Sequence, residues 1–223
     1  MRKGYLTPAE LQKLIRAASG ERNQLLLTVL THTGIRTSEA ISIKVDDVSF
    51  QEGSILIPHL KSGKKNDYRV VAAHPKVLAQ VRNYISNAAL SGQDKLFPVS
   101  RQMVYYIVRD AAEAAGFKGY VLSHPGWNNE HCVSPHRLRD AFATDFCRTQ
   151  AKTIGDVGVL QELLGHARIQ TTLKYMKLSG DDVRRGYMKF MDSFMKQEQA
   201  PAQEPARTKD VVGEAEEIIR QAK

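Results

Sequence analysis

Apolar residues recur at helical spacing along most of the 223-residue chain. The first recurrence follows Thr7-Pro8-Ala9-Glu10, a capping-box pattern with proline in the first turn. The second, over residues 24–33, stops at Gly34, and glycine commonly ends a helix because it tolerates the left-handed conformation. The same spacing predicts further helices over residues 37–43, 75–88, 101–115, 135–148, 156–165, 169–177 and 180–197.

The pattern changes to short strand-like runs between residues 45 and 73. Residues 48–50, 54–59 and 67–73 are rich in β-branched and aromatic side chains, which favour strands. The turn QEG separates the first two runs, and the basic turn KSGKKN, residues 61–66, separates the second and third. The chain is therefore predicted to be mainly α with a small three-stranded antiparallel β-sheet, an α+β fold.

Two stretches lack a periodic pattern. Residues 116–133 are predicted to form a long loop, and residues 199–206 read as a Pro/Ala/Gln linker. These features predict one domain over residues 1–196, followed by a linker and tail over residues 197–223. Residues 210–223 have the composition of a disordered extension but could form a short helix.

The charge of the chain favours a polyanionic partner. Lys and Arg outnumber Asp and Glu by 32 to 24, and after residue 196 six acidic side chains face four basic ones. That tail is therefore at −2 and residues 1–196 are at +10, because the whole chain carries +8. A compact basic body favours nucleic acid over a membrane surface, since no basic amphipathic helix stands out.

Other bulk features narrow the setting. The sequence has no run of 18 apolar residues and no apolar segment of the signal-peptide kind near its first residues. Cys132 and Cys147 are too few for a disulfide framework and fit a reducing cytosol. We therefore expect no membrane association and a cytoplasmic location.

Three stretches place polar residues in apolar surroundings. Arg36 follows the helix-ending glycine, with Glu39 three residues on, and a local surface ion pair would explain both. His136 and Arg139 share one face at the start of a helix that opens with Ser-Pro, a position suited to a phosphate unless that face is simply solvated. His166 follows a second helix-ending glycine, and Tyr175 lies on the next helix, where a buried core tyrosine is the ordinary alternative.

Taken together, these residues suit a single reaction, the attack of a tyrosine on a phosphodiester. A tyrosine hydroxyl attacks only if its proton is removed and the developing charge is stabilised. Two arginines offer planar charged forks that match phosphate oxygens, and histidines can accept or donate protons. A lysine of the turn at residues 61–66 could protonate the leaving alkoxide.

Three segments carry a resemblance to a known family: GIRTSEAISIKVDDV, HRLRDAFATDF and LQELLGHARIQTTLKYMKL. They resemble, in order, the signature regions G-x-R-x-x-E, H-x-L-R and L-G-H…T-x-x-Y of the tyrosine recombinase (phage integrase) family. The resemblance covers residues 6 to about 190 and includes the lysine-bearing hairpin between the first and second regions. It implies a tyrosine recombinase catalytic-domain fold and a site-specific recombinase or integrase that acts on double-stranded DNA.

The resemblance also implies roles for individual residues. Arg36 and Arg139 would hold the scissile phosphate, His136 and His166 would assist proton transfer, and Tyr175 would form a 3′-phosphotyrosine while releasing a 5′-hydroxyl. Glu39 would orient the first arginine. Lys61 is the best match to the family's general acid, ahead of Lys64 and then Lys65. Exchange of a phosphodiester for a phosphotyrosine implies no ATP, no metal and no other cofactor.

The family usually works as a tetramer on DNA and exchanges the segment after the nucleophile between protomers. Residues 181–196 are the candidate for such exchange, because they carry an apolar stripe. Family members also usually have a DNA-clamping domain before the segment that begins here at Leu6, so this chain is expected to lack that domain. Asp145 stands where the family often has histidine.

Three alternatives remain open on the sequence. A type IB topoisomerase uses the same nucleophile, although His136 argues against it because those enzymes tend toward lysine there. A non-catalytic DNA-binding regulator on the same scaffold would have lost part of the residue set, which is complete here. His124, His131, Cys132 and His136 fall within 13 residues, but their spacing matches no zinc pattern.

Overall fold

The computed structural model describes residues 2–58, 68–122, 132–151, 153–176 and 187–192. The chain divides into two units, residues 1–177 and residues 178–223. In the second unit the described residues, 187–192, are helical. The predicted division at residue 196 stays a prediction.

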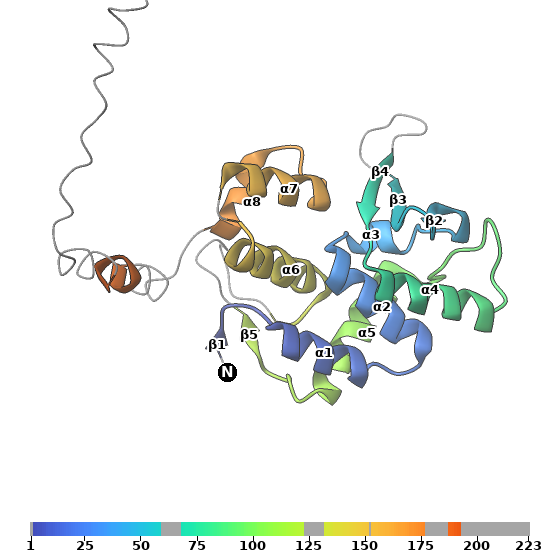
Figure 1. Cartoon of the computed structure of the whole chain (residues 1–223). Helices are drawn as coiled ribbons and strands as arrows, with labels where there is room; N and C mark the ends of the chain where they lie inside the picture. The colour runs from blue at the N-terminus through green and yellow to red at the C-terminus, as the bar shows by residue number, and fades with distance from the viewer. Residues whose placement is uncertain (1, 59–67, 123–131, 152, 177–186, 193–223) are drawn as a thin grey trace, which may run out of the picture. The chain divides into compact units, whose positions relative to one another are not determined.

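Helix α2, Glu21–Thr33, lies at the centre of the first unit and contacts α1, Pro8–Ala17, as well as three later helices (Figure 1). The predicted capping box at the start of α1 is confirmed, because the hydroxyl of Thr7 accepts the amide of Glu10 and the carboxylate of Glu10 accepts the amide of Thr7. Leucines cover most sides of α2 and are buried, as expected for a helix surrounded by others. This helix ends at Gly34 in the left-handed conformation, as predicted.

The predicted three-stranded sheet is confirmed. Strands β2, Val48–Ser49, β3, Ser54–Pro58, and β4, Tyr68–Ala72, pair antiparallel in the order β2-β3-β4. They follow the short helix α3, Thr37–Ala40, and the 3₁₀ turn η1, Val45–Asp47. Pro58 pairs with Tyr68 in the last described pair of β3 and β4, and the predicted basic turn at residues 61–66 lies outside the described residues.

Helices α4, Pro75–Asn87, and α5, Arg101–Ala114, come next, each with a side-chain cap at its first turn. The predicted loop over residues 116–133 is wrong in one part, since it contains β5, Val121–Leu122. This strand pairs in parallel with β1, Arg2–Lys3, near the start of the chain. Two residues are too few to show a strand period, so their pairing could not be read from the sequence.

The remaining helices of the first unit are α6, Pro135–Thr149, α7, Ile154–Leu164, and α8, Ile169–Leu173. The single helix predicted over residues 169–177 is divided, because α8 passes into the 3₁₀ turn η2, Lys174–Met176. Figure 1 shows α7 and α8 lying over α6, on the side of the molecule to which the β3–β4 hairpin also points.

The apolar core has two parts. The larger one joins α1 to α5, the sheet and the start of α6, and the smaller one gathers Leu160, Leu164 and Tyr175 against the second half of α6. The predicted fold class is therefore confirmed, mainly α with a small antiparallel sheet. Among the described helices, none has the length and apolar character needed to cross a membrane.

Candidate active site

Arg36 stands at the N-terminal end of α3, immediately after the turn that ends α2. Its Nη1 donates to Glu39 Oε1 at 2.8 Å, its amide donates to Oε2 at 2.7 Å, and its Nη2 donates to the carbonyl of Gly165 at 3.1 Å. The side chain remains 38% exposed, so one edge of the guanidinium faces solvent. Glu39 is buried and thus orients the arginine instead of forming the surface ion pair of the simplest alternative.

Arg139 lies on α6 and is only 3% exposed. Its Nη1 donates to the carbonyl of Gly34 at 2.6 Å and its Nη2 donates to the carbonyl of Leu164 at 2.7 Å. Burial and the nearby charge of Arg36 lower the pKa of Arg139 to about 10, so the guanidinium stays charged at neutral pH. This one side chain therefore connects the first, second and third signature segments.

Arg69, on β4, is a member of the cluster that the sequence did not single out. Its Nη2 donates to Glu39 Oε2 at 2.9 Å and its Nη1 donates to the carbonyl of Leu163 at 2.8 Å. Its Nε is buried without a hydrogen-bond partner among the described residues. The sequence of β4 could have identified Arg69, because the alternation of a strand places it on the same inward side as the fully buried Val71. A charged side chain on that side requires partners.

Gly165 provides the room for this arrangement. It ends α7 with a φ of 62°, and a Cβ there would lie 2.6 Å from Arg69 Nε. The next residue, His166, is held by a contact of 2.9 Å between its Nδ1 and the hydroxyl of Thr172. Burial, and then the charges of Arg139 and Arg36, lower the pKa of His166 to about 3, so its ring is neutral at pH 7.

Tyr175 lies in η2 and is 2% exposed. Its ring stacks on that of His166 with centroids 6.4 Å apart, and Lys174 Nζ lies 4.8 Å from its centroid. Its hydroxyl donates a short hydrogen bond to Asp140 Oδ1. Burial, followed by the negative charge of Asp140, raises the pKa of Tyr175 well above that of a free tyrosine, so the hydroxyl holds its proton.

Most charged side chains at the start of α6 are buried, whereas the alternative for this helix was a solvated polar face. Arg137 is 8% exposed and Asp140 is fully buried, with Arg137 Nη1 2.7 Å from Asp140 Oδ2. His136 alone of these polar residues faces solvent. Partial desolvation lowers the pKa of His136, and the positive charges of Arg137, Lys174 and Arg139 act in the same direction.

The structure thus places five of the six predicted site residues around the start of α6. Arg36, Arg139 and the turn of His166 are joined by direct hydrogen bonds to main-chain carbonyls, and Tyr175 packs on His166. The sixth, Lys61, lies outside the described residues, as do Lys64 and Lys65. His124 and His131 of the metal alternative also lie outside them, and no cluster of three potential metal ligands occurs in the described part of the chain.

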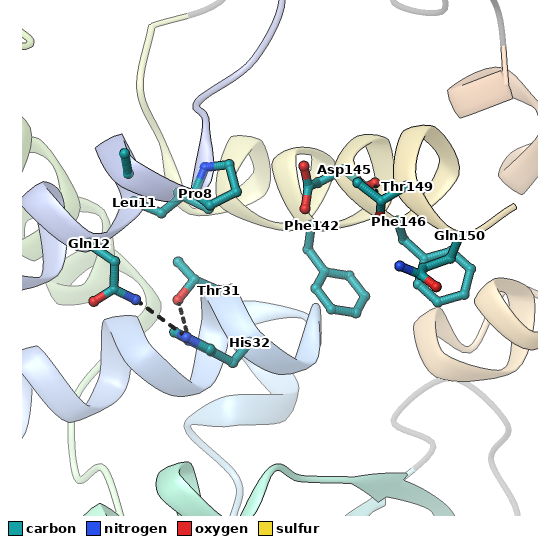
Figure 2. A pocket seen from close by; sticks show the side chains of 11 residues that line it. Pro8, Leu11, Gln12, Thr31, His32, Phe142, Asp145, Phe146, Thr149 and Gln150 are labelled. Atoms are coloured by element: carbon teal, nitrogen blue, oxygen red, sulfur yellow. Dashed lines mark hydrogen bonds between the residues drawn. The ribbon is translucent and has the colours of Figure 1, made fainter.

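A separate cavity of about 440 Å³ lies between the start of α1, the end of α2 and the second half of α6. Figure 2 shows the rings of Phe142 and Phe146 on one side of it and His32, hydrogen-bonded to Gln12 and Thr31, on the other. Its lining is largely apolar and includes none of the predicted site residues.

The sequence profile of the phage integrase family matches residues 4–181. The chain belongs to this family. The matched residues include all three signature segments, from Arg36 to Tyr175.

Several members of the phage integrase family resemble the chain closely enough to align over most of it. A tyrosine recombinase of Pseudothermotoga lettingae is 30% identical over 177 residues, 77% of this chain and 55% of that protein. Tyrosine recombinase XerC of Anoxybacillus flavithermus is 32% identical over 202 residues, 82% of this chain and 61% of that protein. The chain therefore spans less than two thirds of the length of these relatives.

Solved structures give the same result for the fold. A crystal structure of XerA recombinase superposes with a TM-score of 0.65 at 26% identity, covering 83% of this chain and 62% of that one. The XerH site-specific recombinase bound to its difH substrate superposes with a TM-score of 0.61 at 24% identity, covering 82% of this chain and 53% of that one.

Proposed function

We propose that the chain is the catalytic part of a site-specific DNA recombinase of the tyrosine type. One observation carries the proposal: Arg139 joins the carbonyls of Gly34 and Leu164, which brings two arginines and the His166 turn beside the buried Tyr175. Membership of the phage integrase family supports it.

The substrate of this proposal is double-stranded DNA. The exposed edge of Arg36 offers a planar donor for a phosphate oxygen, and the adjacent Arg139 adds a second positive charge. Arginine forks held rigidly by main-chain carbonyls are preorganised for the charge that develops on a five-coordinate phosphorus. The neutral ring of His166 can donate a hydrogen bond to the same group from Nε2 when Nδ1 accepts from Thr172.

In the proposed reaction the oxygen of Tyr175 forms a bond to phosphorus while the bond from phosphorus to the 5′ oxygen breaks. The product is a 3′-phosphotyrosine and a free 5′-hydroxyl, whose proton comes from Lys61 as general acid. A second DNA strand then attacks the phosphotyrosine through its own 5′-hydroxyl. The ester bonds broken and formed are of similar energy, so the exchange requires neither ATP nor a metal ion.

The proposed assembly is a tetramer on DNA in the cytoplasm, with the segment after Tyr175 exchanged between protomers. The support lies in residues 187–192, whose helix exposes Tyr187, Met188 and Phe190 by 59%, 52% and 63%. An apolar surface of this kind is usually covered by a partner. The largely apolar cavity of Figure 2 offers a surface of matching character on another protomer.

The test is formation of a covalent adduct on a pool of centrally nicked duplexes of randomised sequence. The nick lets the short 5′-hydroxyl fragment leave, so the protein stays attached and migrates with the DNA on a denaturing gel. Tyr175→Phe should form no adduct, whereas Lys61→Ala should form it more slowly.

The possible results separate the alternatives. An adduct that survives Tyr175→Phe would assign the nucleophile elsewhere, with Tyr187 the first residue to replace. Relaxation of supercoiled plasmids of any sequence, without exchange of strands, would indicate a topoisomerase. Binding of DNA with no adduct under any condition would indicate a regulator.

A further inference from the structure

The start of α6 holds a buried acid whose contacts are not explained by the roles given so far. Asp140 is fully buried directly after Arg139, in a helix that runs without interruption from Pro135 to Thr149. A buried carboxylate is costly unless it is paired and hydrogen-bonded, so its position calls for a reason. Neither the proposed phosphate contacts nor the proposed general acid uses it.

The two oxygens of this carboxylate have different partners. Asp140 Oδ2 lies 2.7 Å from Arg137 Nη1, one turn earlier on the helix, and Oδ1 accepts the hydroxyl of Tyr175. The contact of Oδ2 with the arginine is an ion pair without hydrogen-bond geometry, so the hydrogen bond of this carboxylate is the one that Oδ1 accepts from the phenol. A nucleophile within hydrogen-bond reach of a base, with the base oriented by a third group, is the arrangement found in activated nucleophiles.

We infer that Asp140 is the general base that takes the proton of Tyr175 as the tyrosine attacks DNA. This inference rests on the proposed function, because it requires Tyr175 to be the nucleophile. The oxygen–phosphorus bond forms, the bond to the 5′ oxygen breaks, and the phenolic proton passes to Asp140 Oδ1. The leaving 5′ oxygen receives its proton from the general acid. In the reverse step Asp140 returns its proton to the released phenol.

The neighbouring groups are less suited to this task. The ring of His166 lies nearly parallel to that of Tyr175, with 13° between the planes and 6.4 Å between the centroids, and its Nδ1 is engaged by Thr172. Lys174 lies over the ring and not at the hydroxyl. Among the described residues, Asp140 is the group that receives a hydrogen bond from the reacting oxygen.

The position of Asp140 in the chain also fits the reaction. Arg139 and Asp140 are consecutive residues of one rigid helix, so the phosphate-binding charge and the proton acceptor hold a fixed relation to each other. Arg139 donates to the carbonyl of Leu164, which belongs to the same apolar cluster as Tyr175, so a phosphate held by Arg139 would lie on the side of the helix where Tyr175 packs. The phenolic proton of Tyr175 can therefore pass directly to Asp140, without an intervening water molecule.

The test compares Asp140→Asn with the wild-type chain in single-turnover adduct formation at saturating DNA, on a nicked duplex recovered from the randomised pool. Asparagine keeps the size of the side chain and can still accept the hydroxyl, but it takes up no proton. We expect adduct formation to slow by about a hundredfold or more, the usual effect of losing a general base. Asp110→Asn is the control, because it replaces an exposed acid on α5, and its rate should stay within about threefold.

A second substrate separates the base from the general acid. In a duplex with sulfur in place of the 5′ bridging oxygen, the leaving thiolate needs no proton. The defect of Lys61→Ala should therefore be relieved on this duplex, whereas that of Asp140→Asn should persist. The inference would be overturned if Asp140→Asn regained the wild-type rate of adduct formation on the sulfur duplex. It would also be overturned if this variant had the wild-type rate on the ordinary duplex.

Asp140→Asn also removes the negative charge of the buried ion pair with Arg137, so a second variant controls for a loss of stability. The double variant Arg137→Met, Asp140→Asn removes both charges of the buried pair, and it should show the same loss with the unfolding temperature of the wild type. A double variant that is folded and fully active would equally overturn the inference. Failure of the wild type to form any adduct would instead contradict the proposed function.

Discussion

Gly34 and Gly165 each end a helix in the left-handed conformation, and each leaves room for a side chain from another part of the chain. A Cβ at Gly34 would lie 2.4 Å from a ring carbon of Phe142, and one at Gly165 would lie 2.6 Å from Arg69 Nε. At these two positions glycine serves both the turn and the close approach of a side chain from another element. The sequence predicted both turns, but it did not predict which side chains lie against the two glycines.

Replacement of Gly34 by alanine should therefore cost more stability than the left-handed backbone alone explains. We expect a loss of about 3 kcal/mol in the free energy of unfolding, of which about 1–2 kcal/mol comes from the backbone and the rest from the displaced Phe142 ring. Gly53→Ala is the matched control, since its φ is 68° but nothing lies within 4 Å of the new Cβ. Urea unfolding of both variants measures the difference, and equal losses would contradict the contact.

The neutral state of His166 makes stability depend on pH. Its folded pKa of about 3 lies below the ordinary value of 6.5, so between these values the unfolded chain binds the proton more readily. A pH that falls below about 6.5 therefore favours unfolding. The contribution of the neutral His166 to stability is fully present only above about pH 6.5.

We expect the free energy of unfolding to fall between pH 7.5 and pH 5, and to fall by less in His166→Gln. Urea unfolding of both proteins at both pH values measures this. The lowered pKa of His136 adds a slope of the same sign in both proteins, so the difference between them isolates His166. Identical slopes would show that His166 does not contribute.

At the scale of elements, the β3–β4 hairpin is joined to the turn after α7 by Arg69. The side chain of Arg69 spans from β4 to Leu163 and Glu39, so the hairpin that carries the lysine turn is held against the cluster. The hairpin could be predicted because its strands alternate locally and are joined by a short turn. Its contact with α7 could not, because it joins residues 94 positions apart.

Arg69→Met should destabilise the chain by about 3 kcal/mol, because it removes one of two positive partners of the buried carboxylate of Glu39 and the donor to the carbonyl of Leu163. Adduct formation should fall as well, since Glu39 orients Arg36. The control is Arg109→Met, which removes an exposed ion pair with Asp110 on α5 and should change stability by less than about 0.5 kcal/mol. Equal effects of the two substitutions would refute the anchoring role.

At the scale of the whole molecule, residues 1–196 carry a net charge of +10, whereas the whole chain carries +8. Binding to DNA releases counterions, so affinity should fall steeply with salt. We expect a loss of about a thousandfold or more between 50 and 200 mM salt if the protein contacts at least about six phosphates. Fluorescence anisotropy on a labelled duplex measures the slope, and an affinity independent of salt would exclude phosphate contacts as the main source of binding.

Assembly is the second property at this scale. Phe190→Asp should reduce cooperative assembly on DNA at least tenfold, because it places a charge in the proposed apolar contact between protomers. Binding of a single protomer should be unchanged. Lys189→Ser on the same helix is the control, and mass photometry of the DNA complexes gives the stoichiometry. Unchanged assembly in Phe190→Asp would remove this helix from the interface.

The sequence by itself determined the order of the helices, the three-stranded sheet and the family of the chain. These features depend on local signals, namely capping residues, helix-ending glycines and the spacing of apolar positions, which a short window contains. The main errors also follow from this limit: the short pairing of β1 with β5 joins residues far apart, and the tight turn η2 interrupts a helical period.

Only the tertiary structure decided the partners of the polar side chains. Arg69 meets Glu39 across 30 positions, and Asp140 meets Tyr175 across 35, distances at which no periodic pattern reports a contact. Arg137 and Asp140 are charged residues that the sequence alone would place at the surface, whereas here α7 and η2 pack against α6 and the two charges pair. Burial of a charge depends on what packs over it, and that is settled only when the distant segments meet.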